Sequence, residues 1–200
     1  TATVAVVAAV IAVIVVFPVA AAAIRRPHPT SQVASVSVVV GFAIPGIVIA
    51  LSLAVLTLNT PVLNRFYQTS GLLVLAYVIH FGSQALAGSE TAVRAVPESL
   101  RESSRLLEPN ATRRLWRVDW PLMRPGLLAA GGLVMLSTLK ELPITLLLSP
   151  IGFDTLATDI WGSYEEGFYA ATGLASIALV ALSATLTWVL VLRRSEVVSS

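Results

Sequence analysis

The stretch from residue 97 to residue 126 is the one long polar segment in a 200-residue chain that is otherwise strongly apolar. Seven arginines lie between Arg94 and Arg124. The acidic residues that accompany them are Glu90, Glu98, Glu102, Glu108 and Asp119. Arginine alone would favour binding to lipid headgroups. A pure lipid anchor has little use for the carboxylates, so docking of another protein is an equally good interpretation, and both stay open.

A second set of polar residues interrupts an apolar run. Lys140 and Glu141 precede Pro143 within the run from Leu127 to Leu148. A charge in the middle of a membrane span costs about 2.5 to 3.5 kcal/mol, so each should have a partner or water. Because Pro143 breaks the helix, the two side chains could meet or face a wet cavity. They either brace the broken helix or line and gate a path through the membrane.

The remaining polar residues give weaker signals. His80, alone in an apolar span, is expected to hydrogen-bond to another helix. Asp154, Asp159, Glu165 and Glu166 lie in a link without basic residues. They would solvate that surface or contact a soluble protein, because a stable metal site needs several converging ligands that are not visible here. We therefore predict no metal and no cofactor.

Composition places these residues in a membrane protein. The chain is 56% hydrophobic and only 12% charged, with a mean hydropathy of +0.84, whereas a soluble domain has about a quarter of its residues charged. Apolar runs of about 20 residues suffice to cross a bilayer. The predicted spans are Val4–Ile24, Val33–Leu58, Leu72–Ala87, Leu127–Leu148 and Ala170–Leu192. The second is expected to bend at Pro45.

The arrangement of basic residues predicts the orientation. With five spans, eleven arginines flank one side and only Arg65 the other. The positive-inside rule then puts the polar segment and the C-terminus in the cytoplasm and the start of the first span outside. The chain begins at Thr1, without Met or a basic leader, so we expect it to be part of a longer protein.

Local signals predict the shape of the polar segment. Pro97 suits the start of a helix, and Pro109 should end it near Leu107. Asn110 is a plausible N-cap for a second short helix over 111–118. In the first helix, Leu100, Ser104 and Leu107 would form a narrow apolar stripe.

Three stretches resemble a known family. ESSRLLEPNATRRLWRVDWPLMRPGLLAAG resembles the cytoplasmic loop of binding-protein-dependent ABC transporter permeases, with Glu102, Ser103 and Ser104 at its Glu-Ala-Ala positions and Pro121 at its closing Pro. LKELPITLLLSPIGFDTLATDIWGSYEEGFYAATGLASIALV and GFAIPGIVIAL resemble the ferric-iron members. The resemblance covers nearly the whole chain and is most specific from Lys140 to Trp161.

The resemblance implies an all-α, five-span, MetI-like importer permease in a bacterial inner (plasma) membrane, most like those for ferric iron. Residues 1–200 would be one domain, the C-terminal half or a cut portion of a longer permease. The implied partners are a separate ATP-binding subunit, a periplasmic or extracellular substrate-binding protein, a second permease half and the bilayer, with no nucleic acid. The ATPase-coupling residues would be Glu98, Arg101, Glu102, Ser103, Ser104, Arg105, Leu107 and Glu108.

The sequence departs from the family at Glu108, which stands where a glycine is usual. With Pro109 behind it, Glu108 should be extended, and we hypothesise that this half couples less symmetrically to its ATPase. The chain has no Gly-rich phosphate loop and no nucleophile–base pair, so it is not expected to be an enzyme. The alternatives are a permease for another small solute, an ion-gradient secondary transporter using Lys140 and Glu141 as a relay, and a membrane scaffold.

Overall fold

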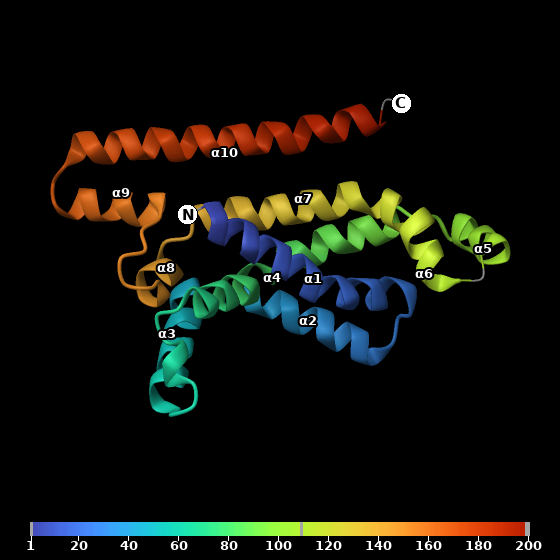
Figure 1. Ribbon diagram of the computed structural model, residues 1–200, viewed down its shortest axis with the longest axis horizontal. Helices are drawn as coiled ribbons and strands as arrows, with labels where there is room; N and C mark the ends of the chain where they lie inside the picture. The colour runs from blue at the N-terminus through green and yellow to red at the C-terminus, as the bar shows by residue number, and fades with distance from the viewer. Residues whose placement is uncertain (1, 109, 199–200) are drawn as a thin grey trace.

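The structure is a computed structural model that describes residues 2–108 and 110–198, without the side chains of residue 111 and of residues 190–198. Every regular element in this part of the chain is a helix (Figure 1), which confirms the predicted all-α fold. In chain order the elements are α1 (Ala2–Arg25), α2 (Pro29–Ala43), α3 (Gly46–Asn59), η1 (Asn64–Phe66), α4 (Ser70–Arg94), α5 (Glu98–Leu107), α6 (Ala111–Arg114), η2 (Leu115–Asp119), α7 (Trp120–Leu139), α8 (Pro143–Leu148), α9 (Leu156–Glu165) and α10 (Tyr169–Val198).

In the described part of the chain, four helices are long and apolar enough to cross a membrane. They are Ala2–Arg25, Ser70–Arg94, Thr112–Leu139 and Tyr169–Val189, and a fifth span results if α2 and α3 count as one bent unit. Figure 1 shows α1, α4 and α10 running one way along the long axis and α2 and α7 running the other way. The course of the chain therefore agrees with the predicted alternation.

The break in the second predicted span lies where expected. α2 ends at Ala43, α3 begins at Gly46, and the two helices are bent by 102°. Pro45 causes the break because it has no backbone N–H and its ring clashes with the preceding turn of a helix. This angle is larger than that of a kink within one membrane-spanning helix. At about 1.5 Å per residue, the 15 residues of α2 rise only about 22 Å before α3 turns aside (Figure 1).

The prediction of a separate short helix over 111–118 is wrong. Residues from Thr112 to Leu139 form one continuous helix through α6, η2 and α7. Within it the N–H of Trp120 donates to the carbonyl of Leu115, five residues earlier, so η2 is a π-helical turn. This wider turn lies directly before Pro121, which has no N–H to donate and whose ring clashes with the carbonyl four residues back in a regular α-helix. The π turn lets the helix pass the proline.

Small residues bring the central helices together. A Cβ atom added to Gly126 of α7 would lie only 2.7 Å from the Cβ of Ala92 on α4. Gly88 and Ala130 make the reciprocal contact one turn away, and a Cβ on Gly88 would collide with Ala130. Small residues spaced by four on both helices permit this close approach. α1 packs against the same pair with buried side chains at the same spacing, three of them alanine: Ala8, Ala12, Val16 and Ala20.

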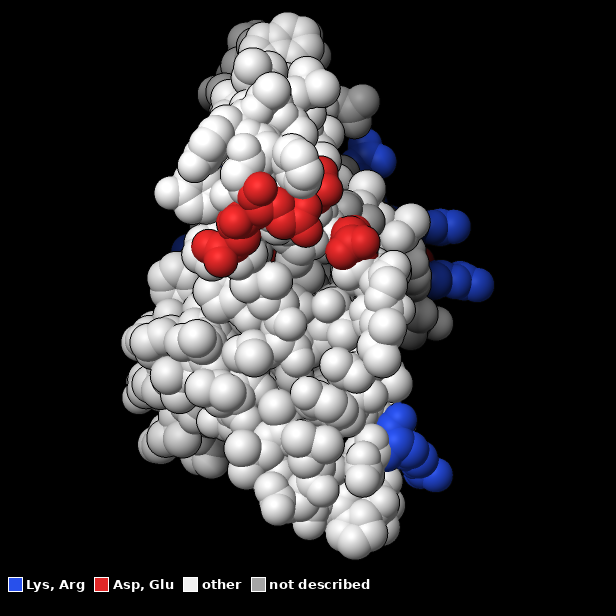
Figure 2. All heavy atoms as spheres, turned by 90° about the vertical axis from the view of Figure 1, so that its left-hand side faces the viewer, with Lys and Arg blue, Asp and Glu red and all other residues white. Residues whose placement is uncertain are grey.

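Charge is divided between the two ends of the bundle. Figure 2 looks onto the end formed by α3, α8 and α9, where acidic side chains gather. α9 itself carries Asp159 and Glu165. The arginine-bearing α5 and α6 lie at the opposite end (Figure 1). This separation agrees with a membrane protein whose basic end faces the cytoplasm.

The helix predicted at the C-terminal end is confirmed as α10, but it stands apart from the bundle in Figure 1. It packs mainly on α9 and touches α7, and no residue is buried in its most apolar stretch. Its sides are therefore open to lipid or to another chain. The side chains of Arg193 and Arg194, which contributed to the predicted orientation, lie outside the described residues.

Candidate functional site

The first helix of the polar segment, α5, forms for the reasons that the sequence indicated. Pro97 is its N-cap, and Glu98 lies in the first turn, where the helix dipole favours a carboxylate. Glu108 is the C-cap, with φ −133° and ψ 96°, and its N–H donates to the carbonyl of Ser104. The predicted end at Leu107 and the predicted extended Glu108 are confirmed.

The residues of the predicted apolar stripe on α5 differ in exposure. Of the three stripe residues, only Ser104 is buried. Leu107 is 87% exposed and Leu106 is 86% exposed, so the last turn presents two bare leucines. Leu100 is also exposed. Ser104 thus makes the buried contact of α5, and the leucines of the last turn face outward.

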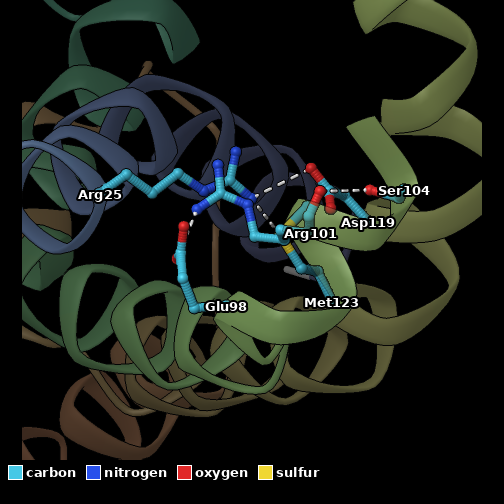
Figure 3. A network of polar contacts seen from close by, with 6 residues as sticks. All are labelled: Arg25, Glu98, Arg101, Ser104, Asp119 and Met123. Carbon is cyan, nitrogen blue, oxygen red and sulfur yellow. Dashed lines mark hydrogen bonds and ion pairs between the residues drawn. The ribbon is translucent and has the colours of Figure 1, made fainter. Parts of the chain in front are cut away.

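The inward face of α5 contributes two charges, Glu98 and Arg101, to a cluster that also contains Arg25 and Asp119 (Figure 3). Nη1 of Arg101 donates to Oε2 of Glu98 at 3.3 Å, and the hydroxyl of Ser104 donates to the carbonyl of Arg101 at 2.8 Å. Across from them, Nη2 of Arg25 donates to Oδ2 of Asp119 at 3.3 Å. Three segments, the end of α1, helix α5 and the π turn before α7, therefore meet in one polar junction.

The connection between α5 and the long helix has its own polar contacts. Oδ1 of Asn110 accepts the N–H groups of Thr112 and Arg113, at 3.0 and 3.3 Å, which confirms the predicted N-cap. Arg117 on the π turn lies 4.0 Å from the carboxylate of Glu108. Glu108, where the resemblance leads one to expect glycine, thus faces an arginine of the next helix.

At the acidic end, Glu141 lies where two helices start. Its Oε1 accepts the N–H of Ile144 at 3.1 Å, in the first turn of α8. A Cβ added to Gly46, the first residue of α3, would lie 2.9 Å from the same oxygen. The positive ends of both helices therefore approach one carboxylate, which a helix dipole stabilises. The breaks in the second and fourth predicted spans meet at this point.

Neighbouring side chains extend that contact into the core. The hydroxyl of Thr145 donates to the backbone carbonyl of Glu141 at 2.8 Å. The buried hydroxyl of Tyr77 on α4 lies 2.6 Å from the Thr145 hydroxyl. Lys140, the C-cap of α7, is exposed, and Pro143 is the first residue of α8. The predicted interruption of the fourth span is confirmed, and its charges lie at a helix end.

His80, the other polar residue predicted within a span, lies among aromatic rings. His80 stacks on Phe42 of α2, with ring centroids 5.8 Å apart, and its ring lies tilted against that of Phe81, with centroids 4.7 Å apart. Its buried Nδ1 has no hydrogen-bond partner among the described residues, so its contact with the neighbouring helix is aromatic and the expected hydrogen bond is absent there. Within residues 2–108 and 110–198, no group of three or more His, Cys, Asp or Glu side chains converges as a metal site would require.

Residues 14–195 match a family described as binding-protein-dependent transport system inner membrane components. The chain belongs to this family. The permease is 30% identical over 141 residues to the Fe(3+)-transport system permease protein FbpB 2 of Haemophilus influenzae, a match that covers 70% of this chain and 28% of the relative. It thus spans little more than a quarter of that relative's length. It is also similar to the solved inward-facing MetNI methionine ABC transporter, with a TM-score of 0.74 and 16% identity over 94% of this chain and 88% of the other.

Sequence reasoning missed three residues of the permease's polar junction. In the sequence, Arg25 is a charge flanking a span and Asp119 is one acid among five, and nothing links them because 94 positions separate them in the chain. One signal was available for Asp119: an acid directly before an apolar helix needs a partner when the helix buries it. Met123, whose sulfur lies 3.5 Å from Nη2 of Arg25, gave no signal at all.

Proposed function

We propose that this permease is the membrane-spanning subunit of an ATP-driven importer and that α5 docks on a separate ATP-hydrolysing subunit. The observation that carries the proposal is the projecting last turn of α5. Leu106 and Leu107 are almost fully exposed there, at the basic end and beyond the ends of the spans. Two bare leucines ringed by charged side chains suit a protein interface better than contact with water.

The charged face of α5 supports the same role. Glu102, Ser103 and Arg105 are exposed beside the leucines, whereas Ser104 and Arg101 face the junction. The small, exposed Ser103 allows close approach of another surface. Arg101 and Glu98 pair with each other within α5 and lie beside Arg25 at the end of α1, so displacement of α5 would move them relative to that span. Glu108 paired with Arg117 gives this half a turn unlike that of a standard half, which supports the hypothesis of asymmetric coupling.

The acidic end would face outward and receive cargo from a soluble substrate-binding protein in the periplasm or outside the cell. Ferric iron is the cargo that we propose, supported by the 30% identity with a protein named for Fe(3+) transport. A second permease half would cover sides of the bundle that remain open, including those of α10. The bacterial inner membrane is the proposed location, and the permease itself would hydrolyse no ATP.

Lys140, Glu141 and Pro143 remain candidates for the translocation path, although the hydrogen bond from Ile144 favours bracing for Glu141. This bond also weakens the case for an ion-gradient secondary transporter. A carboxylate that caps a helix is occupied by its backbone partner, whereas a relay group must exchange protons or ions freely.

Replacing Leu107 with Arg tests the docking directly. In the full transporter, Leu107→Arg should reduce copurification of the ATP-hydrolysing subunit about tenfold or more, since burial of one leucine side chain stabilises an interface by about 1.5 to 3 kcal/mol. The fold should persist because Leu107 is 87% exposed.

Ile151→Arg is the matched control for that experiment. Ile151 is 91% exposed but follows α8 at the acidic end, so its replacement should leave copurification unchanged. If Leu107→Arg retained the ATP-hydrolysing subunit at the wild-type level, the docking role of α5 would be wrong.

A further inference from the structure

The Arg25–Asp119 pair joins the end of the first span to the helix that follows α5. Asp119 is 5% exposed, and its ion pair with Arg25 is a link between the end of α1 and the π turn before α7. Breaking a pair of this kind is costly, because it leaves a buried carboxylate without compensation. The pair therefore favours the arrangement of helices seen here.

The pairing is incomplete on both sides. Nε of Arg25 and Oδ1 of Asp119 are buried, and neither has a hydrogen-bond partner among the described residues. Buried polar groups are nearly always satisfied, so an unmade bond on each partner calls for an explanation. Asp119 has a free oxygen with which it can accept a second donor.

A second donor lies close by. The guanidinium of Arg101 on α5 lies beside that of Arg25 in Figure 3, and the two positive charges repel each other. Arg101 is held by Glu98 of its own helix at 3.3 Å. Arg25 and Arg101 therefore compete for the carboxylates of Glu98 and Asp119. Arg101 belongs to α5, so it moves when α5 moves.

From this geometry we propose that Asp119 is a switchable positioning residue, which binds Arg25 in the arrangement seen here and Arg101 when α5 is displaced. Transfer of Asp119 from Arg25 to Arg101 would release the end of α1 from the long helix and join that helix to α5 instead. The π turn at Leu115–Asp119 supports such a shift, since π turns are local irregularities that often occur at functional sites. The inference rests on the proposed docking of α5 to an ATP-hydrolysing subunit.

Cysteine cross-linking can follow the transfer, because the chain contains no cysteine of its own. The engineered cysteines must leave Arg25, Arg101 and Asp119 in place, so they are put at neighbouring positions in the chain. In the assembled transporter, Arg26→Cys with Val118→Cys should cross-link efficiently through a short bifunctional thiol reagent without nucleotide. Trapping with ATP and orthovanadate should lower that yield about fivefold or more, within the usual range of coupling between sites. The pair Leu100→Cys with Val118→Cys should show the opposite change.

A fixed pair calibrates the measurement. Gln84 on α4 and Ser137 on α7 are joined by a 2.9 Å hydrogen bond within the bundle, so Gln84→Cys with Ser137→Cys should cross-link equally in both states. Equal yields for the 26/118 pair in both states, in a transporter that traps nucleotide, would overturn the switch but leave the proposed function standing. Failure of the wild-type permease to retain any ATP-hydrolysing subunit would instead overturn the proposed function, and the switch with it.

Asp119→Asn gives a second test that does not use cross-linking. It keeps the size of the side chain and removes its charge, so both arginines lose their exchangeable partner. Hydrolysis of ATP in the absence of the substrate-binding protein should rise about fivefold. Ser99→Ala, at an exposed position of α5, should leave hydrolysis unchanged. Asp119→Asn with normal assembly and wild-type hydrolysis would contradict the switch.

Discussion

Single carboxylates at the ends of helices organise both ends of this permease. Glu141 accepts a backbone N–H at the start of α8 and lies against the start of α3, and Asp119 holds the end of α1. Their roles could not be predicted from the sequence, because the partners are backbone groups or distant residues. What the sequence did indicate is that Lys140, Glu141 and Pro143 mark a break.

Two substitutions of Glu141 distinguish the effect of its hydrogen bond to the start of α8 from the effect of its negative charge. Glu141→Ala should lower the unfolding free energy of the detergent-solubilised protein by about 1 kcal/mol, as expected for loss of a cap. Glu141→Gln keeps an oxygen that can accept the N–H of Ile144 and should retain most of the stability. Thermal unfolding of both variants would check this. Equal destabilisation by Ala and Gln would show that the charge, and not the hydrogen bond, supports the two helices.

At the scale of elements, local signals in the sequence predicted where helices begin and end. They did not predict which face of a helix is exposed or the angle between successive helices. Pro97, Asn110 and Pro45 each act on their own backbone, so the start of α5, the cap after it and the break before α3 could be read from the sequence. The exposed direction of Leu107 and the 102° bend after α2 depend on packing between elements. The π turn that carries the helix past Pro121 left no pattern in the hydrophobic residues.

The α4–α7 contact is the element-scale feature most sensitive to substitution. Gly126→Leu should destabilise the detergent-solubilised protein by about 1 to 3 kcal/mol, because its side chain would overlap Ala92. Gly173→Leu is the control, since nothing lies within 4 Å of a Cβ at that position of α10. Thermal unfolding should distinguish the two variants clearly, and similar stability would mean that α4 and α7 pack less closely than described here.

At the scale of the whole molecule, composition and the arrangement of charge predicted the class of protein and the alternation of its spans. The resemblance in the sequence also predicted the family, to which residues 14–195 belong. Neither could show that α10 stands apart from the bundle or that Arg25 and Asp119 meet, because both depend on how distant helices pack. The molecule has an acidic end and a basic end, which the spans join. The breaks at Pro45 and Pro143 lie at the acidic end, and the junction of Arg25 and Asp119 lies at the basic end.

In the proposed function, ATP hydrolysis by a docked subunit, and not an ion gradient, drives import of ferric iron. The most direct measurement is uptake of radiolabelled ferric ion by cells that carry the full transporter, with an uncoupler added while cellular ATP is maintained. We predict that uptake persists without the ion gradient and stops when ATP is depleted. Uptake that ceased when the gradient collapsed, at constant ATP, would contradict the account and favour a secondary transporter.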